Sequence, residues 1–130
     1  MPSTVVLIRG FHGTSPDRME SILEEGFELG VRKYRRDQVH FATDEYPELA
    51  LGFAYNRTRD EFTEKGQAGF MTDDSKLPII IVEVPIEVAE VARNKCTFTV
   101  EAEHIGLIVV RDVVHLPFQT PIDQIHKALL

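Results

Sequence analysis

Residues 7–27, LIRGFHGTSPDRMESILEEGF, decide how the chain begins to fold. The apolar run Val5–Ile8, which overlaps the start of this stretch, predicts a buried strand. Ser15 is a good helix N-cap, and Pro16 suits the first helical position, where no backbone N–H is needed. Gly26 fits the left-handed conformation that often ends a helix. The stretch therefore predicts a strand, a tight connection and a short helix.

His12 and Gly13 fall at the end of the predicted strand and just before the helix, a place where such scaffolds tend to bind ligands. Gly13 has no Cβ, so a flat ligand could approach its backbone N–H and C=O closely. His12 could hold a hydroxyl with one ring nitrogen while the other is fixed inside the protein. The alternative is a histidine that only satisfies a turn, with Gly13 serving the same turn.

Length and composition limit the number of domains and the class of protein. The chain has 130 residues, enough for one domain over residues 1–130, and 43% of them are hydrophobic, enough for a conventional core. No apolar run is long enough to span a bilayer, and the N-terminus does not resemble a signal peptide, so we expect no membrane association. A single cysteine, Cys96, excludes an internal disulfide. We expect a cytoplasmic protein or a delivered effector.

The net charge of −7 and the pI near 5.2 argue against nonspecific nucleic-acid binding, which depends on basic surface. Against this background, a compact basic run after Gly30 stands out; it contains Arg32, Lys33, Arg35 and Arg36. Guanidinium groups pair with phosphate in a forked geometry, so a loop that carries Arg35 and Arg36 beside His12 could hold a diphosphate. A solvated charged loop is the alternative.

His12-Gly13-Thr14, set between a strand and a short helix that ends in Gly26-Phe27, resembles the first motif of the ADP-ribosyltransferase superfamily. This superfamily includes the poly(ADP-ribose) polymerases, the rifampicin ADP-ribosyltransferases and the RNA 2'-phosphotransferases. The resemblance implies that NAD is the substrate, that His12 is catalytic, and that Gly13 and Thr14 bind NAD.

A second segment, residues 38–55, predicts a strand followed by a helix and resembles the second motif of the superfamily. There a strand residue, usually tyrosine in the polymerases, precedes Phe-Ala; here it is His40, as in the RNA 2'-phosphotransferases. The resemblance implies that His40 is catalytic and that Phe41 lies at the cofactor. Ala50 and Phe53 match the small and aromatic residues that line the nicotinamide pocket, and the Phe53 ring could stack on the heteroaromatic. Plain core packing is the alternative for Phe53.

Many ADP-ribosyltransferases also use a glutamate from a late strand. The resemblance places it near Cys96 or Thr97, where this chain has no acid. The nearby carboxylates are Glu90, Glu101 and Glu103, and we select Glu101 as the third catalytic candidate. The RNA 2'-phosphotransferases lack this glutamate and rely on arginines. No metal site is expected.

The remaining pattern predicts further strands and a terminal helix. The predicted strands are Val39–Ala42, Pro78–Pro85, Thr97–Val100 and Ile105–Val110. The helix that follows Val39–Ala42 is capped by Thr43 or Asp44, and residues 55–76 are predicted to be a helix end and a loop. Pro121–Leu130 is predicted to be a short amphipathic helix. Glu83 is interpreted as a solvent-facing residue at a sheet edge. This order predicts the α+β class, and the resemblance implies two small packed antiparallel or mixed sheets flanked by short helices.

The resemblance implies three possible functions. The first is an NAD-dependent mono-ADP-ribosyltransferase, toxin-like or acting on a small molecule, whose acceptor (a protein, nucleic acid or small molecule) is unidentified. The second is an RNA 2'-phosphotransferase-like enzyme that uses NAD, and the acidic net charge counts against it. The third is a catalytically silent member that binds a nucleotide or a partner. We expect the first, because residues of the pocket as well as of the fold match.

Overall fold

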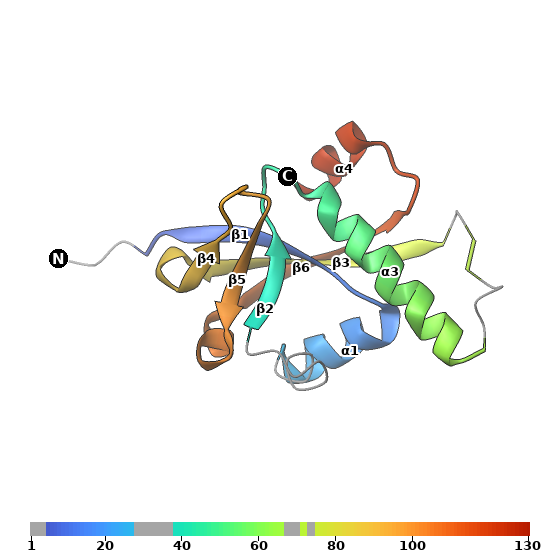
Figure 1. Cartoon of the computed structure of the whole chain (residues 1–130), viewed down its shortest axis with the longest axis horizontal. Helices are drawn as coiled ribbons and strands as arrows, with labels where there is room; N and C mark the ends of the chain where they lie inside the picture. The colour runs from blue at the N-terminus through green and yellow to red at the C-terminus, as the bar shows by residue number, and fades with distance from the viewer. Residues whose placement is uncertain (1–4, 28–37, 67–70, 73–74) are drawn as a thin grey trace.

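The computed structural model describes residues 5–27, 38–66, 71–72 and 75–130 (Figure 1). Within them the fold is α+β, as predicted, and six antiparallel strands form one sheet in the order β4-β5-β2-β1-β3-β6. The strands are β1 (Leu7–Gly13), β2 (Gln38–Ala42), β3 (Lys76–Pro85), β4 (Ala89–Val91), β5 (Thr97–Glu101) and β6 (Val109–Pro117).

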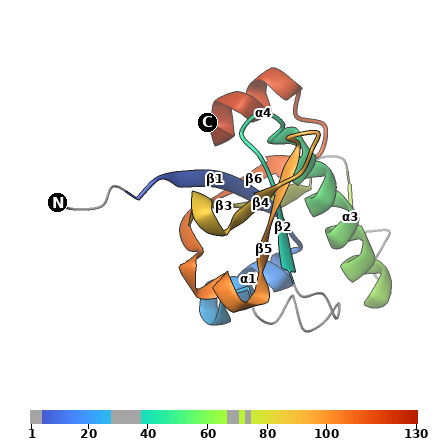
Figure 2. The same cartoon turned by 60° about the vertical axis from the view of Figure 1, so that its left-hand side comes forward.

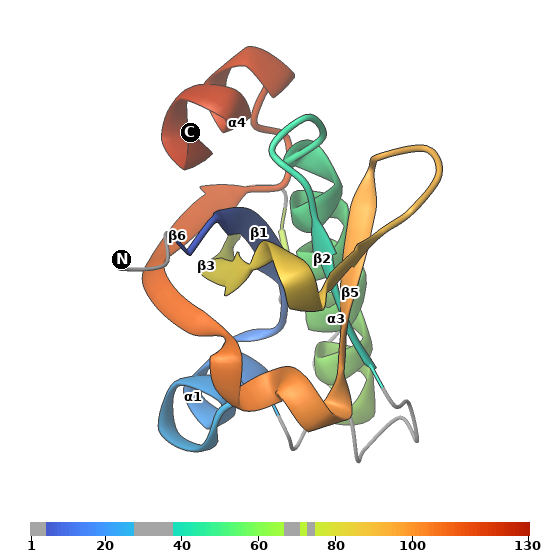
Figure 3. The ribbon, with the colours of Figure 1, turned by 90° about the vertical axis from the view of Figure 1, so that its left-hand side faces the viewer.

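Helices cover both faces of this sheet. They are α1 (Pro16–Glu25), α3 (Glu48–Glu64) and α4 (Ile122–Leu129), with 3₁₀ turns at Ile86–Val88 and Ala102–Leu107. Helices α3 and α4 pack on one face and α1 on the other, so α1 and α4 lie on opposite sides of the strands (Figures 1 and 3). The turn Ala102–Leu107 lies on the same side as α1 (Figure 2).

The sheet is nearly divided between β1 and β2. Strand β1 pairs with β3 along its whole length, from Leu7 opposite Pro85 to Gly13 opposite Ile79. Its pairing with β2, by contrast, is the single register pair of Phe11 with Ala42. The prediction of two separate packed sheets is therefore wrong: there is one sheet, whose halves β4-β5-β2 and β1-β3-β6 meet at one point.

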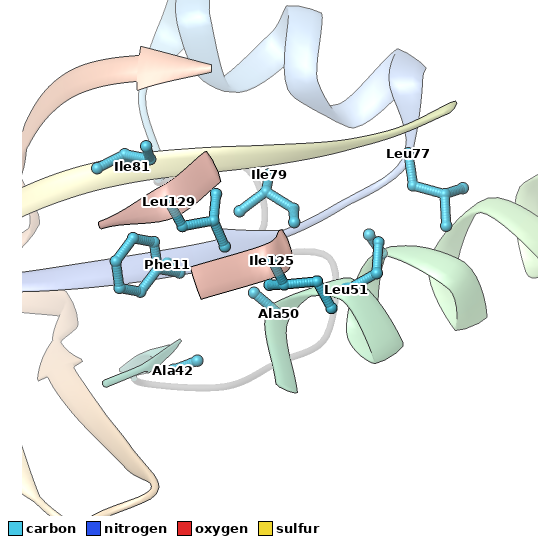
Figure 4. Packing of buried hydrophobic residues seen from close by; sticks show 10 residues of the cluster. Phe11, Ala42, Ala50, Leu51, Leu77, Ile79, Ile81, Ile125 and Leu129 are labelled. Carbon is cyan, nitrogen blue, oxygen red and sulfur yellow. The ribbon is translucent and has the colours of Figure 1, made fainter. Parts of the chain in front are cut away.

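Two cores result from burial of β3 on both faces. Leu77, Ile79 and Ile81 face α3 and α4, where Ile125 and Leu129 approach Phe11 and the small residues of α3 (Figure 4). The alternate residues Ile80, Val82 and Val84 pack with Phe41 and Phe98 on the side of α1. The predicted central strand is confirmed, and it is buried on both faces because helices cover both of them.

Helix α1 forms as its sequence predicts. The backbone N–H of Arg18 donates to Ser15 Oγ at 3.3 Å, Pro16 occupies the first turn, and Gly26 ends the helix with a φ of 81°. Of the apolar residues of α1, Ile22 is buried and Met19 packs against the core, whereas Leu23 is exposed.

Several predicted boundaries are wrong. Val5 and Val6 precede β1 and are exposed rather than buried in a strand. Thr43 does not cap a helix: its hydroxyl donates to the backbone oxygens of Lys95 and Cys96, at 2.6 and 3.3 Å. Helix α3 begins at Glu48 and continues through much of the segment predicted as loop.

In the C-terminal half, too, some predicted element boundaries are wrong. Residues 105–107 belong to the 3₁₀ turn rather than to a strand, whereas Val109–Pro117 form β6. The terminal helix is confirmed, with Ile125 and Leu129 buried but Ile122 exposed. Asp73, Asp74 and the basic run lie outside the described residues.

The edge strand β6 carries a β-bulge. Asp112 pairs with Ile81 and Val110 with Val82, so Arg111 is an extra residue without a partner in the β3 register. Its Nε donates to Glu83 Oε1 at 2.8 Å, which corrects the prediction for Glu83: this carboxylate is on an interior strand and forms an ion pair. The carboxylate of Asp112 accepts from the backbone N–H of Val113 at 2.8 Å.

Candidate functional site

The ring of His12 lies where β1 and β2 separate. In the register that Phe11 and Ala42 set, the strands would next pair Gly13 with His40 through their backbones. Instead, Nδ1 of His12 lies 3.1 Å from the carbonyl oxygen of His40. The side chain of His12 therefore replaces a backbone hydrogen bond at the split in the sheet.

The surroundings of His12 fix its protonation. Its side chain is only 7% exposed and contacts the rings of Phe27 and Phe41, with centroids 5.0 and 5.6 Å away. Burial, followed by the charge of Arg57, lowers the pKa of His12 from 6.5 to about 3, so the ring is neutral at physiological pH. A carbonyl only accepts, so Nδ1 carries the proton and Nε2 keeps its lone pair.

Arg57, on α3, faces that lone pair. Its Nη1 lies 3.4 Å from Nε2 of His12 and also donates to the carbonyl oxygen of Gly13. The guanidinium carbon lies 5.9 Å from the centre of the Phe53 ring, one turn earlier on the same helix. Arg57 thus brings together His12, Gly13 and Phe53.

Gly13 is packed directly against α3. A Cβ on Gly13 would overlap the carbonyl oxygen of Ala50 and would lie 2.7 Å from the backbone nitrogen of Ala54. The lack of a side chain at Gly13 is therefore needed for the approach of the helix. This is a different use from the close approach of a ligand that the sequence suggested.

His40 contacts His12 through its backbone rather than through its ring. Val39 and Phe41 belong to the core on the side of α1, so strand alternation places the His40 side chain on the opposite face, which it shares with Ala42. The imidazole of His40 is still close enough to add to the lowering of the His12 pKa.

Glu101 shares that face with His40. It pairs with Gln38 on the neighbouring strand, and His40 pairs with Thr99, so Glu101 is the diagonal neighbour of His40 across the β2–β5 pair. Diagonal neighbours have Cα atoms about 7–8 Å apart. Glu90, on β4, is opposite Thr99 and one strand further away, and Glu103 is exposed beside His104.

Of the other residues predicted to bind the cofactor, one is exposed and two are buried. Phe53 is 38% exposed, as a stacking surface requires. Phe41 is completely buried and stacks on Phe98, so it lies behind His12 within the core. Thr14 is also completely buried, and its hydroxyl has no hydrogen-bond partner among the described residues. Arg35 and Arg36 lie outside the described residues.

Sequence reasoning missed Arg57. The segment after Tyr55 is polar and predicts a helix end and a loop, yet α3 continues to Glu64. The four-residue spacing of Phe53 and Arg57 was the available signal, because residues at i and i+4 share a helix face.

Comparisons with protein-family models, curated proteins and solved structures find no match for this chain. None of the helices in the described ranges is long and apolar enough to cross a bilayer. In the same ranges, no three His, Cys, Asp or Glu side chains gather as metal ligands would.

Proposed function

We propose that the chain is an NAD-dependent mono-ADP-ribosyltransferase. The observation that carries this proposal is the state of His12. Its Nδ1–H is fixed by the His40 carbonyl and its ring is neutral, so Nε2 is an acceptor aimed beside Gly13. A ribose hydroxyl can donate to such a nitrogen, and this is the division of roles that the sequence suggested for His12.

The chemistry requires few further groups. Transfer from NAD breaks the bond between ribose and nicotinamide through an oxocarbenium-like transition state, as in glycoside cleavage. The backbone of Gly13 would hold the carboxamide of nicotinamide. The half-exposed ring of Phe53 would stack on the pyridine ring, which contributes about 0.5–1.5 kcal/mol beyond burial.

Negative charge near the developing cation would come from Glu101. Its place on the face of His40, diagonal to it, supports this role.

A second candidate, removal of a 2'-phosphate from RNA with NAD, is favoured by the charges around His12. Among the described residues, the charged side chains that shift its pKa are Arg57, Arg18 and His40, all of them basic. A phosphate monoester is already an anionic nucleophile, so it needs no carboxylate base, and guanidinium groups would hold it.

The test is release of nicotinamide from NAD, with water or a 2'-phosphorylated RNA oligonucleotide as acceptor. We expect release by the wild type, and a loss of at least about 100-fold in His12→Ala, as for removal of a group that acts on the reacting sugar. His115→Ala, which changes an exposed histidine on β6, is the matched control and should retain activity.

The acceptor distinguishes the two candidates. Faster turnover with the phosphorylated oligonucleotide, together with loss of its phosphate, would favour the second. If the wild type neither binds NAD nor releases nicotinamide, or if a folded His12→Ala variant is as active as the wild type, the proposal is wrong.

A further inference from the structure

The ring of Phe27 packs edge to face against the imidazole of His12. The two ring centroids lie 5.0 Å apart, and the ring planes make an angle of 89°. Phe27 is only 4% exposed, so this contact lies inside the protein. Phe27 takes no part in the proposed chemistry, although Gly26-Phe27 ends the same sequence motif that begins with His12.

Gly26 determines where Phe27 lies. Its backbone N–H donates to the carbonyl oxygen of Ile22 at 2.8 Å, which completes the last turn of α1. Its φ of 81° and ψ of −172° fall in a region that essentially only glycine occupies. The chain therefore leaves α1 in a direction that other residues do not readily adopt. This direction returns Phe27 to the core on the side of α1, which also contains Ile22 and Phe41.

Two aromatic rings, rather than one, enclose the imidazole. Phe41 lies 5.6 Å from His12 and 5.5 Å from Phe27, so the three rings form a triangle. Phe98 stacks on Phe41, with ring centroids 5.1 Å apart. Because side chains in such a core are closely packed, the imidazole has little room to turn.

The imidazole needs this support at one atom in particular. The hydrogen bond from Nδ1 to the carbonyl of His40 fixes one corner of the ring. A single hydrogen bond tolerates a broad range of angles, so it leaves the ring free to tilt about that corner. Nε2 of His12, which would accept from the ribose, is on the other side of the ring and would move most. A group that acts on a reacting atom must be held to within about 0.5 Å.

The same aromatic contacts keep water away from His12. Burial is the largest of the causes that lower its pKa to about 3. The charged or titratable side chains that face it within the described residues are Arg57 on α3, Arg18 on α1 and His40 on β2, and each lowers the pKa further. A change that admits water to the ring would therefore raise this pKa.

We propose that Phe27 is a positioning residue for His12: its ring fixes the plane of the imidazole and so directs Nε2 toward the reacting sugar. This inference rests on the proposed function of His12. Phe27 acts through the imidazole and not on the substrate. Helix α1 then serves the site by bringing the chain back, through Gly26, to the histidine that precedes the helix.

The test compares nicotinamide release from NAD by the wild type, Phe27→Leu and Phe98→Leu. Phe98 is the matched control, because it is buried in the same core but stacks on Phe41 rather than on His12. We expect Phe27→Leu to lower kcat at least about tenfold, as for misplacement of a group that acts on the reacting atoms. KM for NAD should stay within about threefold, because Gly13 and Phe53 are unchanged. Phe98→Leu should keep both constants within about threefold.

A second readout needs no substrate. The pKa of His12, followed by NMR, should rise from about 3 by at least about one unit in Phe27→Leu, because water gains access to the ring. Phe98→Leu should leave it unchanged. Phe27→Met replaces Phe27→Leu if the latter does not fold, since methionine fills irregular apolar space without a ring.

The outcomes separate the two proposals. If a folded Phe27→Leu keeps the wild-type kcat, or if Phe98→Leu lowers kcat and shifts the His12 pKa equally, the positioning role is wrong and the proposed function stands. If the wild type releases no nicotinamide, the proposed function is overturned, and the role of Phe27 in it falls as well.

Discussion

The two ends of β1 differ in a way that their composition does not indicate. Its first residues are apolar, yet Leu7 is 41% exposed and Val6, just before it, is 52% exposed. Its last residues include a glycine and a histidine, and they are buried. The first end pairs with the end of β3 away from the helices, whereas the second lies under α3 and beside β2. Burial along β1 therefore depends on which elements cover the strand. As a result the polar residue His12 is more tightly packed than the apolar residue Leu7.

Gly13→Ala should destabilise the buried end of β1 more than any other change considered. A Cβ there overlaps backbone atoms of α3, which cannot move without moving the helix, so we expect a loss of about 3 kcal/mol or more in the free energy of unfolding, measured in urea. Gly52→Ala is the control. It lies in the same helix with open space around it, and it should stabilise the protein by about 0.5–1 kcal/mol. A loss below about 1 kcal/mol for Gly13→Ala would contradict the packing at this end of β1.

His12 should make the buried end sensitive to acid. Its folded pKa of about 3 lies below its unfolded value of 6.5, so between these values the unfolded state binds more protons, and stability falls as the pH falls from 6.5 toward 3. From pH 7 to pH 5 this group alone should remove roughly 2 kcal/mol from the free energy of unfolding. His12→Gln lacks the titration and should lose that much less over the same range. Parallel pH profiles of wild type and variant would show that His12 is not held neutral.

Leu7→Thr should have the smallest effect. The side chain is largely exposed, and threonine keeps the preference for strand structure, so the free energy of unfolding should change by less than about 0.5 kcal/mol. Phe11→Leu, four residues later in the fully buried part of β1, is the comparison and should destabilise by at least about 1 kcal/mol in the same urea experiment. Equal losses at the two positions would mean that β1 is not divided in this way.

Much of the fold could be predicted wherever local chemistry decides it. Ser15, Pro16 and Gly26 define α1 through capping and backbone freedom, and the β-branched run in β3 fits only a strand that is covered on both sides. The errors occurred where tertiary contacts decide. Thr43 is a good local cap, but its hydroxyl serves the turn between β4 and β5 instead.

The candidate site was predictable in part for the same reason. The sequence placed His12 and Gly13 at a strand end and His40 on another strand, and these strands are neighbours. It could not show that the contact uses the backbone of His40, because that depends on how β1 and β2 separate. Arg57 depends in addition on the length of α3, whose second half is too polar for apolar periodicity to mark.

The interruption of β6 bears on how the protein behaves when concentrated. An outermost strand with a regular row of free amides is a template to which other chains can add. Here the extra residue Arg111 breaks the row near the start of β6, and the carboxylate of Asp112 already accepts from the amide of Val113. Removal of the Asp112 carboxylate would free a backbone donor in a valine-rich segment. A substitution there should therefore promote self-association through β6 rather than loss of folding.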